Sequence, residues 1–310
     1  MLLESYGPVA DWLINLNGPP TYRKLHRKVS GYPEAVGSPA AAGIAPVNPL
    51  SVVSFNSTCL EVLDRSYVER GPVVLFCLIM LGLLGPALLL LVVVLPLEMI
   101  RGGGDRLLNP LVILLILIAA GALAYCLWGP IKTALTRVCF GLTCYPIRFN
   151  RRNHQVYALT GQGAPVKMPW SELVFYTDES SIFGVWPKQS RLAAVIIGVT
   201  RRQDLDGFWE FIRVYMDEPD APAALADKVG LCPPLSGTGN GRRWALWYND
   251  YRYQAFDSKF LTLLCRPVAW CHILAEAACR RPVWPEWIRE ECRVDSDDPF
   301  ARDERSNPPW

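Results

Sequence analysis

Two long uncharged segments constrain the fold of this chain more than any other feature. The first runs from Gly71 to Leu97 and the second from Leu107 to Ile131, and neither contains Asp, Glu, Lys, Arg or His. A helix needs about 20 residues to cross the hydrocarbon core of a bilayer. A core helix of a soluble protein is the alternative, but such a helix is rarely apolar on all sides over such a length. We therefore predict two transmembrane helices.

The connection between these segments predicts how they are arranged. It comprises only Glu98–Arg106, so the two helices must run antiparallel as a hairpin over residues 71–131. Small residues at similar depth, Gly82 and Gly85 in the first segment and Ala119–Gly121 in the second, predict a close approach of the backbones. No charge interrupts either segment, which argues against a proton or ion pathway.

Composition narrows the function classes. Hydrophobic residues make up 51% of the 310 residues, charged residues make up 19%, and the formal net charge is only +2. A nucleic-acid partner is not expected, because such proteins carry a strong basic field. The 10 cysteines include no CxxC pair, so free thiols in a reducing compartment are expected rather than a disulfide framework.

Basic residues predict the orientation, because cytoplasmic flanks of membrane helices are enriched in Lys and Arg. The short loop contains Arg101 and Arg106. The outer flanks contain Arg65, Arg70, Lys132, Arg137, Arg148, Arg151 and Arg152. This distribution favours a multi-pass protein with both termini in the cytoplasm, and the N-terminus lacks the pattern of a cleavable signal.

Residues 1–70 form an N-terminal region that we expect to be partly disordered. Residues 31–49 are rich in Gly, Pro and Ala, which is typical of a linker. The basic cluster Arg23–Lys28 could contact anionic headgroups or could be a solvated helix face.

The pattern changes after the second apolar segment. "IRFNR" and "HQVYAL" alternate polar and apolar residues around a turn at Arg151–Asn153, which predicts a β-hairpin. Residues 191–202 and 207–218 are interpreted as a second strand pair, and residues 244–281 as helix broken at Pro267. We therefore predict an α+β fold in which the transmembrane hairpin is followed by a β-sheet domain, residues 145–293, capped by C-terminal helices. Residues 294–310 are expected to be a disordered tail.

The segments "IRFNRRNHQVYAL" and "VKMPWSEL", placed after two closely spaced apolar segments, resemble an uncharacterised proteobacterial family of two-span inner-membrane proteins with an R-F-N-R hairpin motif. Members are often encoded near type VI secretion effectors. The layout more loosely resembles bacterial PH-like domains. The resemblance covers roughly residues 72–218. It implies a bacterial inner-membrane location, a PH-like domain, and an accessory or immunity role beside a secreted effector or secretion component.

Arginines of the predicted β-hairpin are the first candidate binding residues. Arg148, Arg151 and Arg152 follow the membrane segments closely and could contact anionic headgroups. A solvated turn with one ion-paired strand residue is the alternative.

Aromatic residues of a predicted helix are the second candidate. Trp244, Trp247, Tyr248 and Tyr251 have the spacing i, i+3, i+4, i+7 and share one helical face. Trp244, Trp247 and Tyr251 are proposed to contact a partner or the headgroup region. Alternatively, this face covers the sheet.

Motifs for catalysis are missing from the sequence. Cys265, Cys271, His272 and Cys279 lack the tight spacing of a zinc site, and "SGTGNGRR" lacks phosphate-loop spacing. We therefore expect no metal, no cofactor and no enzymatic activity. The expected partners are the lipid bilayer and an effector or secretion component, with a possible homo-oligomer. A membrane-tethered lipid- or protein-binding scaffold is the first alternative, and a membrane enzyme without a recognisable motif is the second.

Overall fold

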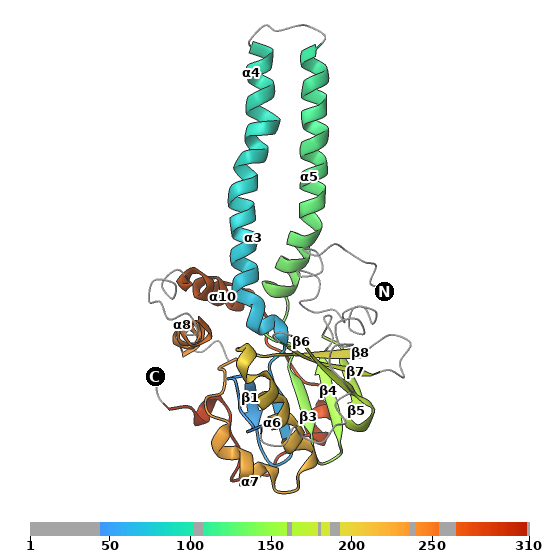
Figure 1. Cartoon of the computed structure of the whole chain (residues 1–310), viewed down its shortest axis with the longest axis vertical. Coiled ribbons are helices and arrows are strands. Elements are labelled where there is room, and N and C mark those ends of the chain that lie inside the picture. Colours follow the sequence, from blue (N-terminus) through green and yellow to red (C-terminus); the bar gives the residue numbers. More distant parts are fainter. Residues whose placement is uncertain are drawn as a thin grey trace.

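The protein consists of a long pair of helices and an α+β domain at one end of them (Figure 1). The computed structural model describes residues 44–101, 108–159, 163–178, 181–186, 193–235, 240–253 and 265–308. The basic cluster Arg23–Lys28 lies outside the described residues.

The first helical arm is continuous and apolar. It comprises α3 (Arg65–Leu89), a π-helical turn at Leu90–Val94 and α4 (Leu95–Arg101). The Asp64 side chain caps α3 by accepting a hydrogen bond from Ser66 N at 2.9 Å. By length and composition, the stretch Arg65–Glu98 can cross a membrane.

The second arm is α5 (Leu108–Val138), whose most apolar described stretch, Leu111–Ala122, is shorter. The expected close approach of the two backbones at Gly82, Gly85 and Gly121 is wrong: a Cβ atom at any of these glycines would meet no described atom within 4 Å.

Five antiparallel strands form the larger sheet, in the order β1-β2-β3-β4-β5. They are β1 (Val52–Phe55), β2 (Cys59–Val62), β3 (Ile147–Asn150), β4 (Gln155–Leu159) and β5 (Pro165–Pro169). The predicted β3–β4 hairpin is confirmed.

The helical arms are inserted between two neighbouring strands of this sheet. Val62 at the end of β2 pairs with Ile147 at the start of β3, and Cys59 pairs with Asn150. The sheet domain therefore begins before the helices, rather than following them as the sequence suggested. An antiparallel helical hairpin returns the chain to where it left, so the strands on either side of it can pair.

The smaller sheet contains β6 (Val174–Asp178), β7 (Ser181–Trp186) and β8 (Ala193–Gly198), paired antiparallel in that order. Helix α6 (Leu205–Asp217) follows. Residues 207–218 were expected to form a strand, and this expectation is wrong.

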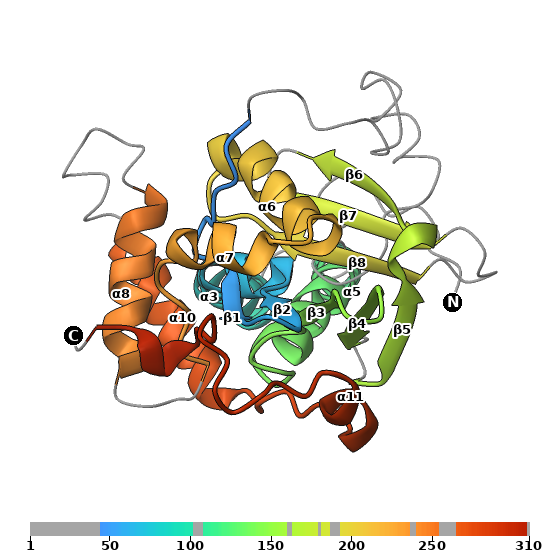
Figure 2. The same cartoon turned by 90° about the horizontal axis from the view of Figure 1, so that it is seen from below.

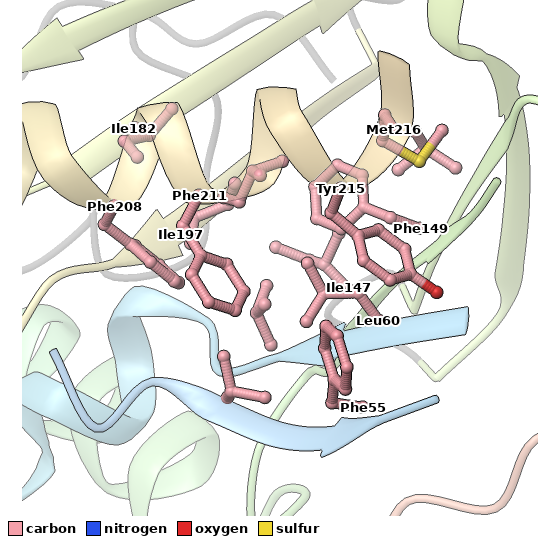
Figure 3. Close-up of a cluster of buried hydrophobic side chains, with 14 of the residues drawn as sticks. Phe55, Leu60, Ile147, Phe149, Ile182, Ile197, Phe208, Phe211, Tyr215 and Met216 are labelled. Atoms are coloured by element: carbon pink, nitrogen blue, oxygen red, sulfur yellow. The ribbon is translucent and has the colours of Figure 1, made fainter. Parts of the chain in front are cut away.

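The side chains of α6 explain its helical state. Phe208, Phe211, Ile212 and Tyr215 are buried and recur with the period of a helix. They pack on side chains of both sheets, including Phe149 from β3 (Figure 3). This helix therefore closes the main core.

The C-terminal segment covers another part of the larger sheet (Figure 2). Helices α7 (Ala221–Leu225), α8 (Asn240–Tyr253), α10 (Arg266–Ala278) and α11 (Glu286–Glu291) belong to this half of the chain. Trp284, Ile288 and Cys292 form a second cluster with Cys59, Tyr145, Tyr157 and Leu159.

The prediction of a disordered tail is wrong for residues 294–308. Arg302 pairs with Phe55 as a β-bridge, with backbone N–H···O distances of 2.9 and 2.7 Å. Ser57 donates to Asp298 from both its backbone and its hydroxyl. Edge strand β1 thus supplies hydrogen-bond partners that make this polar segment ordered.

Candidate functional site at the base of the helical arms

Arg148, the first predicted headgroup contact, lies inside the domain. Its guanidinium donates to Glu61 Oε2 from Nε at 2.9 Å and from Nη2 at 2.5 Å, and it lies over the Trp284 ring, 4.8 Å from the centroid. The Trp284 indole N–H also donates to Glu61. This ion pair joins β2, β3 and the C-terminal segment, so it has a structural role.

Arg151 and Arg152 lie in the β3–β4 turn. Arg151 donates to the carbonyls of Glu218 and Pro219, while Arg152 is exposed. Glu218 and Pro219 belong to the connection between α6 and α7. Helix α7 lies at the end of the domain opposite to the helical arms (Figure 1). This placement argues against headgroup contact by the turn in a membrane that the arms cross.

The predicted aromatic face of α8 forms a small core. Trp244 is only 1% exposed and clusters with Leu50 and Tyr248, and the partly buried Trp247 and Tyr251 pack against this group. The Arg201 guanidinium lies 3.6 Å from the Tyr251 ring centroid. The face covers the segment before β1 rather than the sheet, and it leaves little aromatic surface for a partner.

The structure brings together a different group of residues, where α10 crosses the first turns of α3. A Cβ atom at Gly71 would lie 2.6 Å from the Val268 carbonyl oxygen, so only glycine allows this contact. The Tyr67 and His272 rings meet edge to face, with centroids 4.9 Å apart. This crossing fixes α10 to the base of the first arm.

Four polar side chains at this crossing, Tyr67, Arg70, His272 and Glu276, form what we call the junction cluster. Arg70 is fully buried and donates from Nη2 to the Leu142 carbonyl at 2.8 Å, which ties α3 to the segment after α5. Among the described residues, the Tyr67 hydroxyl, Arg70 Nε and Nη1, His272 Nε2 and Glu276 Oε1 have no hydrogen-bond partner. Such groups are costly to bury.

Burial controls the protonation states in the junction cluster. Desolvation, with Arg70 and Arg252 nearby, lowers the pKa of His272 to about 3. Desolvation also raises the pKa of Glu276, although Arg70 opposes this shift. His272 is therefore neutral at pH 7, and Arg70 is the fixed positive charge of the cluster.

Two buried thiols lie beside Arg148. A hydrogen bond from the Cys59 thiol lowers the pKa of Cys292 to about 7, although burial acts in the opposite direction. Arg148 and the Asn150 amide also lower this pKa. The same hydrogen bond, together with burial, raises the pKa of Cys59. The pair belongs to the core beneath the C-terminal segment, and no metal-binding group of three or more His, Cys, Asp or Glu side chains occurs in the part of the chain that the structure describes.

The sequence did not indicate the junction cluster. Arg70 directly precedes an apolar segment, and His272 lies near three cysteines without the spacing of a metal site. Nothing in the segment "CHILAEA" indicates that its histidine contacts Tyr67, which lies more than 200 positions earlier in the chain.

Large apolar side chains remain exposed above this cluster, on both arms. On the first arm they begin at Leu78 and continue to Leu97, and on the second they include Leu115, Ile118, Tyr125 and Trp128. Turns of α3 below Leu78 are covered instead, because Val73, Val74 and Cys77 pack with Cys271 and Ala275 of α10. The exposed apolar surface therefore begins where α10 ends its contact with α3.

No protein-family model, no curated protein and no solved structure matches the chain.

Proposed function

We propose that this protein is an integral membrane binding protein whose helical arms cross the bilayer and hold the α+β domain against one surface. The observation that carries the proposal is the continuous exposure of large apolar side chains along the arms. Leu83, for example, is 65% exposed. Soluble monomers rarely expose apolar patches of this extent, whereas lipid stabilises them.

The way in which the arms join the domain supports a binding role. The Asp64 carboxylate receives hydrogen bonds from Ser66 N at the start of α3 and from Tyr145 N just before β3. Arg70 adds the bond to Leu142. These contacts replace a flexible linker, so the domain would present its surface at a fixed distance and orientation from the membrane.

The finer parts of the proposal rest on the sequence. We infer two crossings, an inner-membrane location and cytoplasmic termini from the apolar lengths, the basic flanks and the family resemblance. A PH-like domain remains a prediction, which is supported by the order of antiparallel strands followed by helix α6.

Membrane integration is tested by expressing the full chain in a bacterium and extracting the membranes with alkaline carbonate. The chain is expected to stay in the membrane pellet, and a double variant with Leu89→Arg and Ala122→Arg, two exposed positions near the middle of the arms, is expected to lose this retention, because each charge is costly at the bilayer centre. A matched variant with Arg152→Gln and Arg289→Gln changes two exposed residues of the domain and should remain in the pellet. Recovery of the unaltered chain in the soluble fraction would refute the proposal.

Two crossings are tested with reporter fusions. Green fluorescent protein at the C-terminus is expected to fluoresce, and alkaline phosphatase inserted between Arg101 and Leu108 is expected to be active, because this loop would lie outside the cytoplasm. Active phosphatase at both the loop and the C-terminus, with no fluorescence from the C-terminal green fluorescent protein, would indicate a single crossing by the first arm.

The role beside a type VI secretion effector rests on the resemblance alone. We propose that the protein protects a cell by binding a membrane-targeting effector. A sensitive strain producing the full chain is expected to survive challenge with the effector encoded next to it. Survival no better than that of the empty-vector strain, with the chain present in the membrane fraction, would exclude protection.

A further inference from the structure

Helix α10 has an exposed apolar stripe on the side away from the domain core. Trp270 is 51% exposed and Leu274 is 62% exposed, and Ala277 and Ala278 are exposed as well. Trp270 and Leu274 are four positions apart, so they share one face of the helix. The opposite face, which contains Cys271, His272 and Ala275, is buried against α3 and α8. This amphipathic helix therefore leaves one apolar face without a partner in the described chain.

The stripe lies on the side of α10 that is nearer to the apolar arms. Cys271 and Ala275 pack with Val74 and Cys77, whereas His272 contacts Tyr67, which lies lower on α3. Leu274 lies three positions after Cys271, and Ala278 lies three positions after Ala275, so these exposed residues are next to the contact with Val74 and Cys77 on the helix surface. They lie on the side of the helix away from His272. The stripe is thus continuous with the exposed surface that begins at Leu78.

The length of the arm places α10 at the edge of the hydrocarbon core. At about 1.5 Å per residue, the exposed stretch from Leu78 to Leu97 is about 30 Å long, which matches the hydrocarbon thickness of a bilayer. The turns from Gly71 to Cys77, which α10 crosses, then lie at headgroup depth.

Charge at the ends of α10 fits anionic lipid. Arg266 begins the helix, and Arg280 and Arg281 follow its end, and all three are exposed. Basic residues around a Trp- and Leu-containing face are typical of helices that lie in the plane of a membrane surface. Gly71 reinforces this geometry, because its contact with Val268 holds α10 across α3 rather than along it (Figure 1).

We propose that α10 is an interfacial helix that inserts Trp270 and Leu274 among the acyl chains and pairs Arg266, Arg280 and Arg281 with anionic lipid headgroups. This inference rests on the proposed membrane integration. It makes lipid, through α10, a determinant of the domain's orientation. The β3–β4 turn, to which the sequence assigned this task, lies at the other end of the domain.

Site-specific photocrosslinking in lipid nanodiscs tests the inference on the full chain. Nanodiscs are prepared from a mixture of phosphatidylglycerol and phosphatidylethanolamine, and p-benzoylphenylalanine replaces Leu274, or Trp270 in a second variant. Leu83 in the arm is the positive control, and Trp287 on α11, which is 40% exposed, is the negative control. Mass spectrometry after irradiation then identifies the crosslinked molecules.

We expect lipid adducts when the crosslinker is at Leu274, Trp270 or Leu83, and no lipid adduct when it is at Trp287. In a variant with Arg266→Gln, Arg280→Gln and Arg281→Gln, the ratio of phosphatidylglycerol adducts to phosphatidylethanolamine adducts at Leu274 should fall several-fold. Adducts at Leu83 but at neither α10 position would overturn the inference and leave membrane integration intact. Protein adducts at Leu274, from a second copy of the chain, would overturn it in favour of a homo-oligomer contact. No lipid adduct at Leu83 would overturn both proposals.

Discussion

At the scale of single residues, a basic side chain that follows a long apolar helix can stabilise the core of the domain rather than contact a lipid headgroup. Arg148 directly follows Ile147 in a short strand, and its partner Glu61 is itself buried. The low exposure of both side chains makes their ion pair costly to break, because either partner alone would be a buried, uncompensated charge.

We predict that Arg148→Met lowers the stability of the domain by about 3 kcal/mol, since it leaves Glu61 buried and unpaired. Arg152→Met is the matched control, because Arg152 lies in the same hairpin but is exposed. The measurement is thermal unfolding of the full chain in detergent micelles, followed by tryptophan fluorescence. Equal midpoints for the two variants would contradict the internal role of Arg148, and a salt-dependent loss of vesicle binding in both would restore the headgroup role.

The junction cluster predicts a pH dependence of stability. The pKa of His272 is lowered from its ordinary value of 6.5 to about 3, so the folded protein binds the proton less well than the unfolded chain. Stability is therefore fully present above about pH 6.5 and falls as the pH decreases from 6.5 towards 3, by up to about 1.4 kcal/mol per pH unit.

Replacement of His272 by Phe is expected to remove this component, while keeping the edge-to-face contact with Tyr67. The measurement compares the unfolding midpoints of the unaltered chain and the variant from pH 7.5 to pH 5. Glu276 titrates in both proteins, so the difference between them isolates His272. His154→Asn, at an exposed turn position with φ 51°, is the control. Parallel pH profiles for all three proteins would contradict the assignment.

At the scale of elements, one glycine determines how α10 meets α3. Gly71 lies in van der Waals contact with Val268, whereas Gly82, eleven residues further along the same helix, faces no described atom within 4 Å. From the sequence, close packing was expected at Gly82, within the predicted pair of transmembrane helices, and no role was expected for Gly71. Contact across helices from distant parts of the chain decides which glycine is required.

We predict that Gly71→Ala displaces α10, because the new methyl group overlaps the Val268 carbonyl, at a cost of about 1–3 kcal/mol. The buried Cys271 should then react faster with maleimide, as measured by mass spectrometry of its peptide. Gly82→Ala is the matched control in the same helix and should leave the rate unchanged. Equal labelling rates in both variants would show that the contact with Val268 does not hold α10 in place.

At the scale of the whole molecule, the helical hairpin is an insertion within a single folded domain. Phe55, Leu60 and Val62 precede the helical arms and belong to the same core as Ile147 and Phe149, which follow them. The domain boundary at residue 145 that the sequence suggested cuts through this core. Folding of the sheet therefore requires both sides of the hairpin.

We predict that residues 145–310 alone do not fold, because β3 loses its neighbour β2 and the core loses the side chains of Val52, Phe55, Leu60 and Val62. The fragment is expected to aggregate and to be digested rapidly by trypsin. Co-expression of residues 1–144 should restore a trypsin-resistant complex in the membrane fraction. A soluble 145–310 fragment with the protease resistance of the full chain would contradict the inserted topology.

The sequence by itself determined the features that depend on neighbouring residues. The length of the first apolar segment predicted a helix able to cross a membrane, and alternation predicted β3 and β4 with the turn between them. Such patterns are local, so they are visible without a partner. The local pattern was misleading for α6, which was expected to be a strand, because packing of its apolar side chains on two sheets stabilises the helix.

Only the tertiary structure decided which of the candidate residues are available for function. Arg148 is neutralised by Glu61, Arg151 is held by carbonyls after α6, and Trp244 is enclosed with Leu50. These partners are distant in the sequence, and burial depends on them rather than on the residue's own neighbours. For the same reason, the crossing of α3 by α10, with its junction cluster and its exposed stripe, emerged only when the chain was folded.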